Sequence, residues 1–174
     1  MEDLLQHPTR RHLYEEVRKR PGISARELQR ALDIGWGEAA HHLRQLTDAG
    51  LLRRERGGRR DYYFLPEITW QDRKTLLLLR SPAERMILVG LASSPGLSFP
   101  QVVSHAGLSK STVSFHMHHM IELGVVEGYR EDNVLRYRPQ DRERLAELLR
   151  RYREGFDDRL VDQFVGVWSQ LLRE

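Results

Sequence analysis

The chain has 174 residues, of which 30% are charged and 40% are hydrophobic. These proportions are typical of a soluble protein with one or two small folded domains. The longest apolar run, 76–79, is far too short for a membrane span of about 20 residues, and Glu2 and Asp3 stand where a secretory signal carries Lys or Arg. The sequence has no cysteine, which excludes disulfides and thiol catalysis. We therefore expect a cytoplasmic protein without membrane contact.

Positive charge is concentrated in the first third of the chain, although the formal net charge is only +3. Most of the local excess comes from five arginines in one short segment, 53–60. These are Arg53, Arg54, Arg56, Arg59 and Arg60. Guanidinium groups match the geometry of phosphate oxygens, so this segment is predicted to contact nucleic-acid phosphates. The alternative is a solvated hairpin with no ligand.

Residues 1–66 are predicted to form three helices followed by a hairpin. Pro8 suits the first turn of a helix, and Ser24 suits an N-cap. The predicted helices cover 8–20, 24–32 and 37–49. Gly57 and Gly58 then supply the positive φ angles that a tight hairpin turn requires. Residues 67–80 contain neither Gly nor Ser, and we predict a helical linker there.

The pattern of residues 1–66 recurs further along the chain. One constant offset in residue number aligns Pro21-Gly22 with Pro95-Gly96 and His42 with His116, and the alignment needs no gap. We infer a duplicated domain, 81–138, with its own three helices and hairpin. In this copy Ser98 and Ser109 are predicted N-caps, and the third helix covers 109–123.

Residues 139–174 are predicted to form a long helix, with apolar residues at spacings of three and four. Gly155 is a position where this helix can kink or break. The sharper interpretation is a dimerisation helix, and the alternative is a helix folded back over its own domains. The predicted dimer face consists of Leu145, Leu149, Tyr152, Phe156, Leu160, Phe164, Trp168 and Leu171.

The predicted fold is therefore mainly α with small β-hairpin wings. Two helices joined by a short turn and followed by a hairpin are the parts of a winged helix-turn-helix domain, whose later helix enters the major groove of DNA. The residues at 109–117 and 123–126 resemble the recognition-helix signature of the ArsR and MarR-like winged-helix regulators. Pro8 to Arg11 and Gly35 to Gly37 resemble archaeal regulators that carry two winged helix-turn-helix domains, and the likeness covers about residues 3–138. The resemblance implies a DNA-binding regulator of transcription.

The helix at 109–123 is predicted to turn an apolar stripe to the core, formed by Val113, Met117, Met120 and Ile121. Polar and aromatic side chains then face outward as candidates for contacts with base edges and phosphates. These candidates are Lys110, Ser111, Thr112, Ser114, Phe115 and His118. An amphipathic helix with a merely solvated face is the alternative.

The two copies differ in the chemistry of their predicted DNA-facing parts. The third helix of the first copy carries Glu38 and Ala40, so it is predicted to read little sequence. The second hairpin keeps Arg130 and Arg136 but has two acidic residues at its tip. We therefore predict a division of labour, in which the helix at 109–123 supplies base contacts and the hairpin at 53–60 supplies positive charge.

Neither a metal site nor an enzymatic site is predicted. His116 and His118 point about 200° apart around a helix, so they do not share one ion, and no phosphate loop or hydrolase motif is present. We expect no cofactor, and duplex DNA and a second copy of the chain as partners. Two other functions stay open, a DNA-coating nucleoid protein and a protein-binding scaffold. The operator, the sign of regulation and any effector have no sequence indication.

Overall fold

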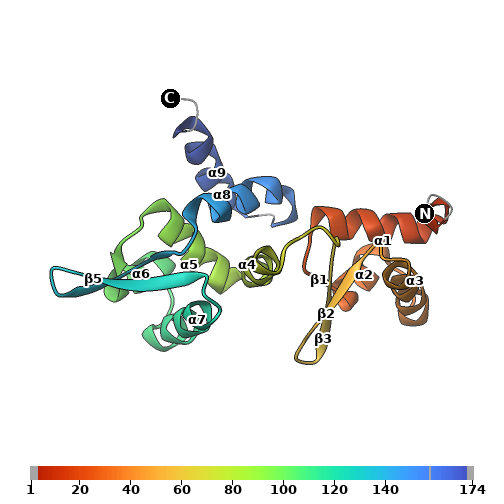
Figure 1. Cartoon of the computed structure of the whole chain (residues 1–174), viewed down its shortest axis with the longest axis horizontal. Helices are drawn as coiled ribbons and strands as arrows, with labels where there is room; N and C mark the ends of the chain where they lie inside the picture. Colours follow the sequence, from red (N-terminus) through yellow and green to blue (C-terminus); the bar gives the residue numbers. More distant parts are fainter. Residues whose placement is uncertain (1–3, 157, 172–174) are drawn as a thin grey trace. The chain divides into compact units, whose positions relative to one another are not determined.

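The computed structural model describes residues 4–156 and 158–171, with the side chain of Leu171 outside the description (Figure 1). The chain divides into two compact units, Met1–Arg73 and Lys74–Glu174. The boundary falls inside helix α4 (Trp70–Arg80), within the segment predicted as a helical linker. Among the described helices, none has the length and apolar character needed to cross a membrane.

Unit 1 consists of helices that pack on one small sheet. Its elements are η1 (Leu4–Gln6), α1 (Pro8–Lys19), β1 (Ile23–Ser24), α2 (Ala25–Leu32), α3 (Trp36–Asp48), β2 (Arg53–Gly57) and β3 (Arg60–Phe64). The antiparallel sheet has the strand order β1-β3-β2. Leu13, Leu28, Leu43 and Phe64 are fully buried and join all three helices to the sheet.

Unit 2 repeats this order and adds a carboxyl-terminal part. Its further elements are α5 (Pro82–Ser93), β4 (Leu97–Ser98), α6 (Phe99–Ala106), α7 (Lys110–Glu122), β5 (Val126–Glu131), β6 (Val134–Pro139), α8 (Arg142–Arg151), η2 (Arg153–Gly155) and α9 (Arg159–Leu171). Helices α1, α2 and α3 align end to end with α5, α6 and α7 at the constant offset found in the sequence. The structure therefore confirms the predicted repeat.

The helix boundaries are set by the capping residues that the sequence indicated. Ser24 and Glu27 form a capping box at the start of α2, and the Oγ of Ser109 accepts a hydrogen bond from the backbone N–H of Thr112 at 3.2 Å. Gly107 ends α6 with a φ of 61°. A glycine has no Cβ to clash in this left-handed conformation, so the turn before α7 forms at little cost.

The sheets contain one strand more than was predicted. Ile23 and Ser24 pair with Tyr63 and Tyr62, and Leu97 and Ser98 pair with the equivalent strand of unit 2. Strands this short have no periodicity of their own, so the hydropathy pattern does not reveal them. They tie the base of each hairpin to the helices.

The two hairpin turns use different residues for the same geometry. Of the two glycines at the first hairpin, only Gly58 has a positive φ. Gly57 lies within β2 and pairs with Arg60, so the prediction that both glycines supply positive φ angles is wrong. In unit 2 both Asp132 and Asn133 have positive φ, which is the requirement of a type I′ turn.

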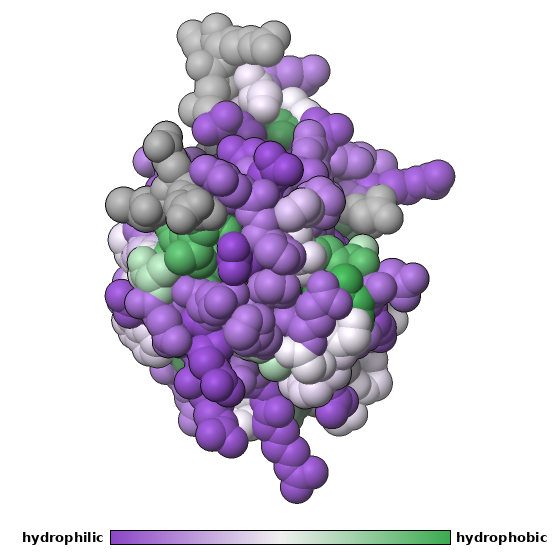
Figure 2. All heavy atoms as spheres, turned by 90° about the vertical axis from the view of Figure 1, so that its right-hand side faces the viewer, coloured by the Kyte–Doolittle hydropathy of each residue, from purple (hydrophilic) through white to green (hydrophobic). Residues whose placement is uncertain are grey.

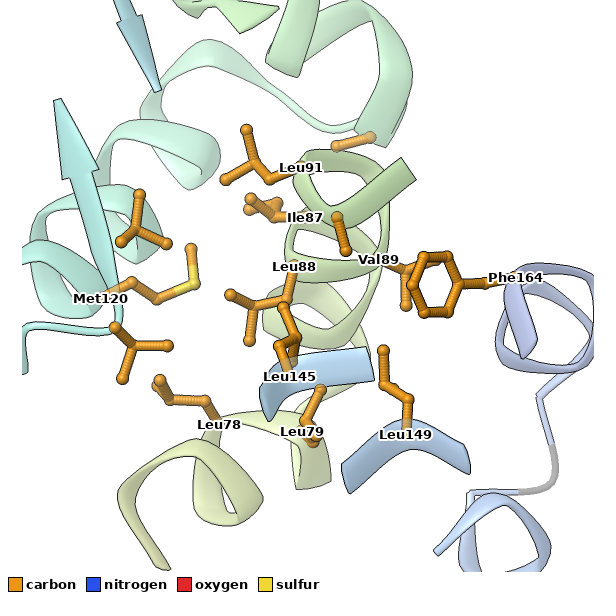
Figure 3. Packing of buried hydrophobic residues seen from close by; sticks show 14 of the residues in the cluster. Leu78, Leu79, Ile87, Leu88, Val89, Leu91, Met120, Leu145, Leu149 and Phe164 are labelled. Carbon is orange, nitrogen blue, oxygen red and sulfur yellow. The ribbon is translucent and has the colours of Figure 1, made fainter. Parts of the chain in front are cut away.

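The core of unit 2 draws on helices from both ends of the unit (Figure 3). Leu79 of α4, Leu88 of α5, Met120 of α7 and Leu149 of α8 are fully buried in one cluster. Phe164 of α9 packs against the same cluster, on the side of Val89 (Figure 3). The segments before and after the winged domain are thus part of its core.

The long helix predicted over residues 139–174 breaks next to Gly155, the position at which the sequence allowed a kink or a break. Helix α8 ends at Arg151, and α9 begins only at Arg159 after the short η2 turn. The break lets both helices pack on unit 2, as in the folded-back alternative.

Most of the predicted dimer face is buried or partly buried for the same reason. Leu145, Leu149, Tyr152 and Phe164 are buried inside unit 2, and Phe156 and Trp168 are partly buried against its core. Their assignment to a dimer interface is therefore corrected. Leu160 is 38% exposed, and the side chain of Leu171 lies outside the described residues.

Candidate nucleic-acid interface

Helix α7 has a buried apolar side and an exposed polar side. Val113, Met117 and Met120 are buried at spacings of four and three. The outer side carries five of the six predicted contact residues in exposed positions. They are Lys110, Ser111, Ser114, Phe115 and His118.

Two residues of α7 depart from the predicted pattern. Ile121 is 40% exposed, so its assignment to the apolar stripe is wrong. It lies about 100° around the helix from Met120, at the edge of the stripe, and the helix ends one residue later. Thr112 is partly buried, and its hydroxyl lies 2.8 Å from that of Ser109. This hydroxyl serves the start of the helix.

Phe115 is the most exposed large hydrophobic side chain among the described residues, with 71% of its surface accessible. It lies at the middle of α7, between Ser114 and the partly buried His116. A single exposed apolar side chain is common on protein surfaces, so the exposure of Phe115 alone does not indicate a ligand. A thymine methyl group in the major groove is an apolar feature that such a ring can contact.

The corresponding face of α3 has different chemistry. Trp36 is exposed at the first position of the helix, and Glu38 is exposed in its first turn, where its carboxylate accepts a hydrogen bond from Thr9 at 3.3 Å. His41 and Arg44 are also exposed. A carboxylate at the start of a helix is repelled by DNA phosphates, so α3 is less suited than α7 to enter a groove.

The arginines of the first hairpin divide between its two faces. Side chains alternate along a strand, which places Arg54 and Arg56 on one face and Arg53 on the other, and Arg59 lies in the turn. Arg54 lies 3.9 Å from Asp61. In the described part of the chain, the side chains of Arg53, Arg56, Arg59 and Arg60 make no hydrogen bond or ion pair.

The base of the first hairpin is fixed by a buried ion pair. Glu55 of β2 accepts a hydrogen bond from the guanidinium of Arg73 in α4, and both side chains are largely buried. The charge of Glu55 is therefore neutralised by Arg73, so Glu55 does not offset the positive charge of the exposed arginines on this hairpin. Burial also raises the pKa of Tyr63 on the neighbouring strand.

The arginines of the second hairpin are already bonded. Arg136 pairs with Glu131 at 2.8 Å and donates to the carbonyl oxygen of Gly96 at 2.9 Å. Arg138 pairs with Glu127 at 2.7 Å, and Arg130 donates to a backbone carbonyl oxygen. The two hairpins therefore differ in the availability of charge as well as in its amount. Arg130 and Arg136 are weaker candidates for phosphate contact than the sequence indicated.

A polar cluster that sequence reasoning missed lies behind α7. The buried carboxylate of Glu84 in α5 has one oxygen 2.8 Å from Nδ1 of His119 and 3.2 Å from Nδ1 of His116. Unit 1 places Arg10, Gln45 and His42 at the equivalent three positions. There the Oε1 of Gln45 accepts from Arg10 at 2.9 Å and lies 3.3 Å from Nδ1 of His42. The constant offset between the two copies pairs these positions. This pairing was the one sequence feature that could have indicated the cluster.

The histidines do not form a metal site in the described residues, where no group of three or more potential ligands is arranged to hold an ion. The face of the molecule in Figure 2 is mainly hydrophilic, with a few small hydrophobic patches.

Two family models match the chain, one mainly in unit 1 and the other in unit 2. A model described as an N-terminal HTH domain matches residues 7–76, and the IclR helix-turn-helix domain matches residues 86–128. The chain carries two helix-turn-helix domains in tandem. The structure agrees, because α2 with α3 and α6 with α7 are the paired helices and a hairpin follows each pair.

Comparisons with whole proteins extend beyond the single domains. An uncharacterized HTH-type transcriptional regulator of Methanocaldococcus jannaschii is 28% identical over 136 residues, which are 78% of this chain and 34% of that protein. The chain thus spans about a third of the length of this relative. A crystal structure of a protein from Corynebacterium diphtheriae covers 79% of this chain and 27% of its own, at 16% identity and a TM-score of 0.31. A likeness of that size assigns neither fold nor function.

Proposed function

We propose that this tandem helix-turn-helix protein binds duplex DNA in the cytoplasm, on the nucleoid, and regulates transcription. The main support comes from α7, which occupies the position of a recognition helix. One side of this helix is apolar and buried, and the opposite side is polar and exposed. The name of the archaeal relative supports the regulatory part of the proposal. The helix positions Ser111, Ser114 and Phe115 for base edges, while Lys110 at its start suits a phosphate.

The proposal includes a division of labour between the two domains. The free guanidinium groups of Arg56, Arg59 and Arg60 attract phosphates without reading sequence. The face of α7 supplies the sequence preference, because hydroxyl and aromatic groups distinguish base edges. The exposed carboxylate of Glu38 on α3 and the bonded arginines of the second hairpin favour this assignment over the reverse one.

The test is a binding experiment with a random duplex pool, followed by sequencing of the enriched sites. The chain, an Arg56→Ala/Arg59→Ala variant and a Ser114→Ala variant are titrated with an enriched duplex and a shuffled one at several salt concentrations. We expect the hairpin variant to weaken binding to both duplexes equally and to flatten the salt dependence. The α7 variant lowers the preference between the duplexes. Equal loss of preference in both variants would contradict the division of labour.

The same experiment separates the alternative functions. Strong, salt-dependent binding with no enriched sequence indicates a DNA-coating nucleoid protein. An absence of binding at low salt removes the DNA proposal and favours the protein-binding scaffold. An enriched palindrome supports a dimeric regulator.

We also propose that the chain forms a homodimer through the outer side of α9. Leu160 and Val167, two helical turns apart on that side, are 38% and 59% exposed, and a spacing of seven places them on one stripe. Two charged substitutions, Leu160→Glu and Val167→Glu, are expected to produce a monomer in analytical ultracentrifugation with an unchanged circular dichroism spectrum. A dimer that persists in the double variant would contradict this interface.

A further inference from the structure

The cluster of Glu84, His116 and His119 connects the helix proposed to contact DNA with the helix behind it. One oxygen of the Glu84 carboxylate faces both imidazoles, and Glu84 is only 6% exposed. An ionised carboxylate accepts hydrogen bonds and donates none. With Glu84 ionised, both histidines donate from Nδ1, which sets the tautomer of each neutral ring.

The fixed tautomer determines what the outer edge of His119 can do. Its ring is half exposed, and Nε2 is the ring nitrogen that Glu84 does not engage. In the neutral ring this nitrogen only accepts hydrogen bonds. A phosphate oxygen is also an acceptor, so it can bond to Nε2 only when the ring is an imidazolium.

Electrostatics, like the hydrogen bonding, favour a protonated His119 next to a DNA phosphate. The carboxylate of Glu84 places a negative charge just inside the helix that is proposed to approach the DNA backbone. A proton on His119 cancels this charge and adds a donor for phosphate, and the field of the DNA favours that proton. His116 is more deeply buried, and its Nδ1 lies 3.2 Å from the same Glu84 oxygen.

We propose that unit 2 takes up a proton on His119 when it binds the DNA backbone, and that Glu84 is the positioning residue for this contact. The inference rests on the proposed DNA-binding function. It predicts that DNA affinity rises as the pH is lowered, because binding takes up a proton.

Other charged groups around α7 have partners of their own. Lys74 of α4 donates to the carbonyl oxygen of Leu123, and Arg85 of α5 turns away to Asp158. Glu122 pairs with His118 on α7, and Glu127 of β5 pairs with Arg138. On α6, His105 lies against α5 at Gly90, more than one helical turn from Glu84.

Unit 1 provides a natural control for this cluster. Its three equivalent residues, Arg10, Gln45 and His42, keep a hydrogen-bonded contact between α1 and α3 without a carboxylate. The double variant Glu84→Arg/His119→Gln places the unit 1 residues in unit 2. The hydrogen-bonded contact between α5 and α7 is then retained, while the Glu84 carboxylate and the His119 imidazole are removed.

The test is isothermal titration calorimetry of the full chain with one enriched duplex near pH 7, in two buffers of different ionisation enthalpy. The difference in binding heat between the buffers measures the protons taken up. We expect an uptake of up to one proton for the unaltered chain and for His12→Gln, which removes an exposed histidine of α1 that lies outside the proposed DNA-contacting face of α7. The uptake is lost in His119→Gln and in Glu84→Arg/His119→Gln.

The outcomes separate the two proposals. Binding with a heat that does not depend on the buffer overturns the proton-linked contact and leaves DNA binding intact. An equal loss of uptake in His12→Gln and His119→Gln also overturns it, because the effect then belongs to any exposed histidine. The absence of binding in either buffer overturns both proposals.

Discussion

At the scale of single residues, the free energy of an arginine contact depends on what the guanidinium already binds. The side chain of Arg56 makes no hydrogen bond or ion pair within the described residues, whereas Arg138 is engaged by Glu127 and lies 4.8 Å above the ring of Tyr129. We expect Arg56→Ala to reduce the log–log salt slope of DNA binding by about 0.9 for each lost phosphate contact. Arg138→Ala is the matched control and leaves the slope unchanged. Fluorescence anisotropy across a salt series measures both, and equal slopes for the two variants would refute the contrast.

A second residue-scale prediction concerns the turn before each third helix. Asp33 and Gly107 occupy equivalent positions, with φ angles of 51° and 61°. Left-handed backbone strains any residue that has a Cβ, although Asp tolerates it better than most. We expect Gly107→Asp to destabilise the protein and Asp33→Gly to stabilise it, each by about 0.5–1 kcal/mol. Urea denaturation followed by circular dichroism tests this, and a destabilised Asp33→Gly protein would show that the aspartate has another role.

At the scale of elements, sequence reasoning succeeded where local chemistry sets the structure. The proline, serine and glycine residues at helix ends predicted α5, α6 and α7 because capping and left-handed turns are local effects. It failed where the decision depends on distant contacts. The apolar spacing of Leu145 and Leu149 suits a dimer helix and a folded-back helix equally, and only the core around Leu79 and Leu88 distinguishes the two.

In the candidate interface, too, sequence reasoning failed for contacts between residues that are far apart along the chain. The exposed side of α7 followed from helical periodicity, apart from Ile121, which is exposed, and Thr112, which is partly buried. The bonding of Arg136 to Gly96 and the cluster at Glu84 could not be predicted, because each depends on partners that are far apart along the chain. Helical periodicity places a side chain on a face of its own helix and does not name its partner.

The attachment of α9 leads to a pH-dependent prediction at this scale. Burial raises the pKa of Asp158, but this is outweighed by the hydrogen bond from Arg85 and by the backbone N–H groups of Leu160 and Val161, so that the pKa lies below 3.8. A lowered pKa stabilises the fold above the unfolded value, and this stability is lost as the pH falls through the folded value.

We therefore expect Asp158→Asn to reduce the free energy of unfolding at pH 7 by on the order of 1 kcal/mol. The difference from the unaltered protein should shrink as the pH falls below 3.8. Asp162→Asn is the control, since its ion pair with Arg153 is on the surface and contributes little. Urea titrations at several pH values measure the effect, and a difference that persists at low pH would contradict the ionic origin.

At the scale of the whole molecule, each unit buries its own apolar core, and this predicts that each unit loses stability separately. Leu13 and Ile87 are equivalent residues of α1 and α5, at 0% and 1% exposure. Replacing either with alanine leaves a cavity that costs about 2–5 kcal/mol. Hydrogen exchange read by mass spectrometry should show faster exchange in residues 4–73 for Leu13→Ala, and in the described residues beyond 73 for Ile87→Ala. Faster exchange throughout the chain in either variant would show that the two units unfold as one cooperative body.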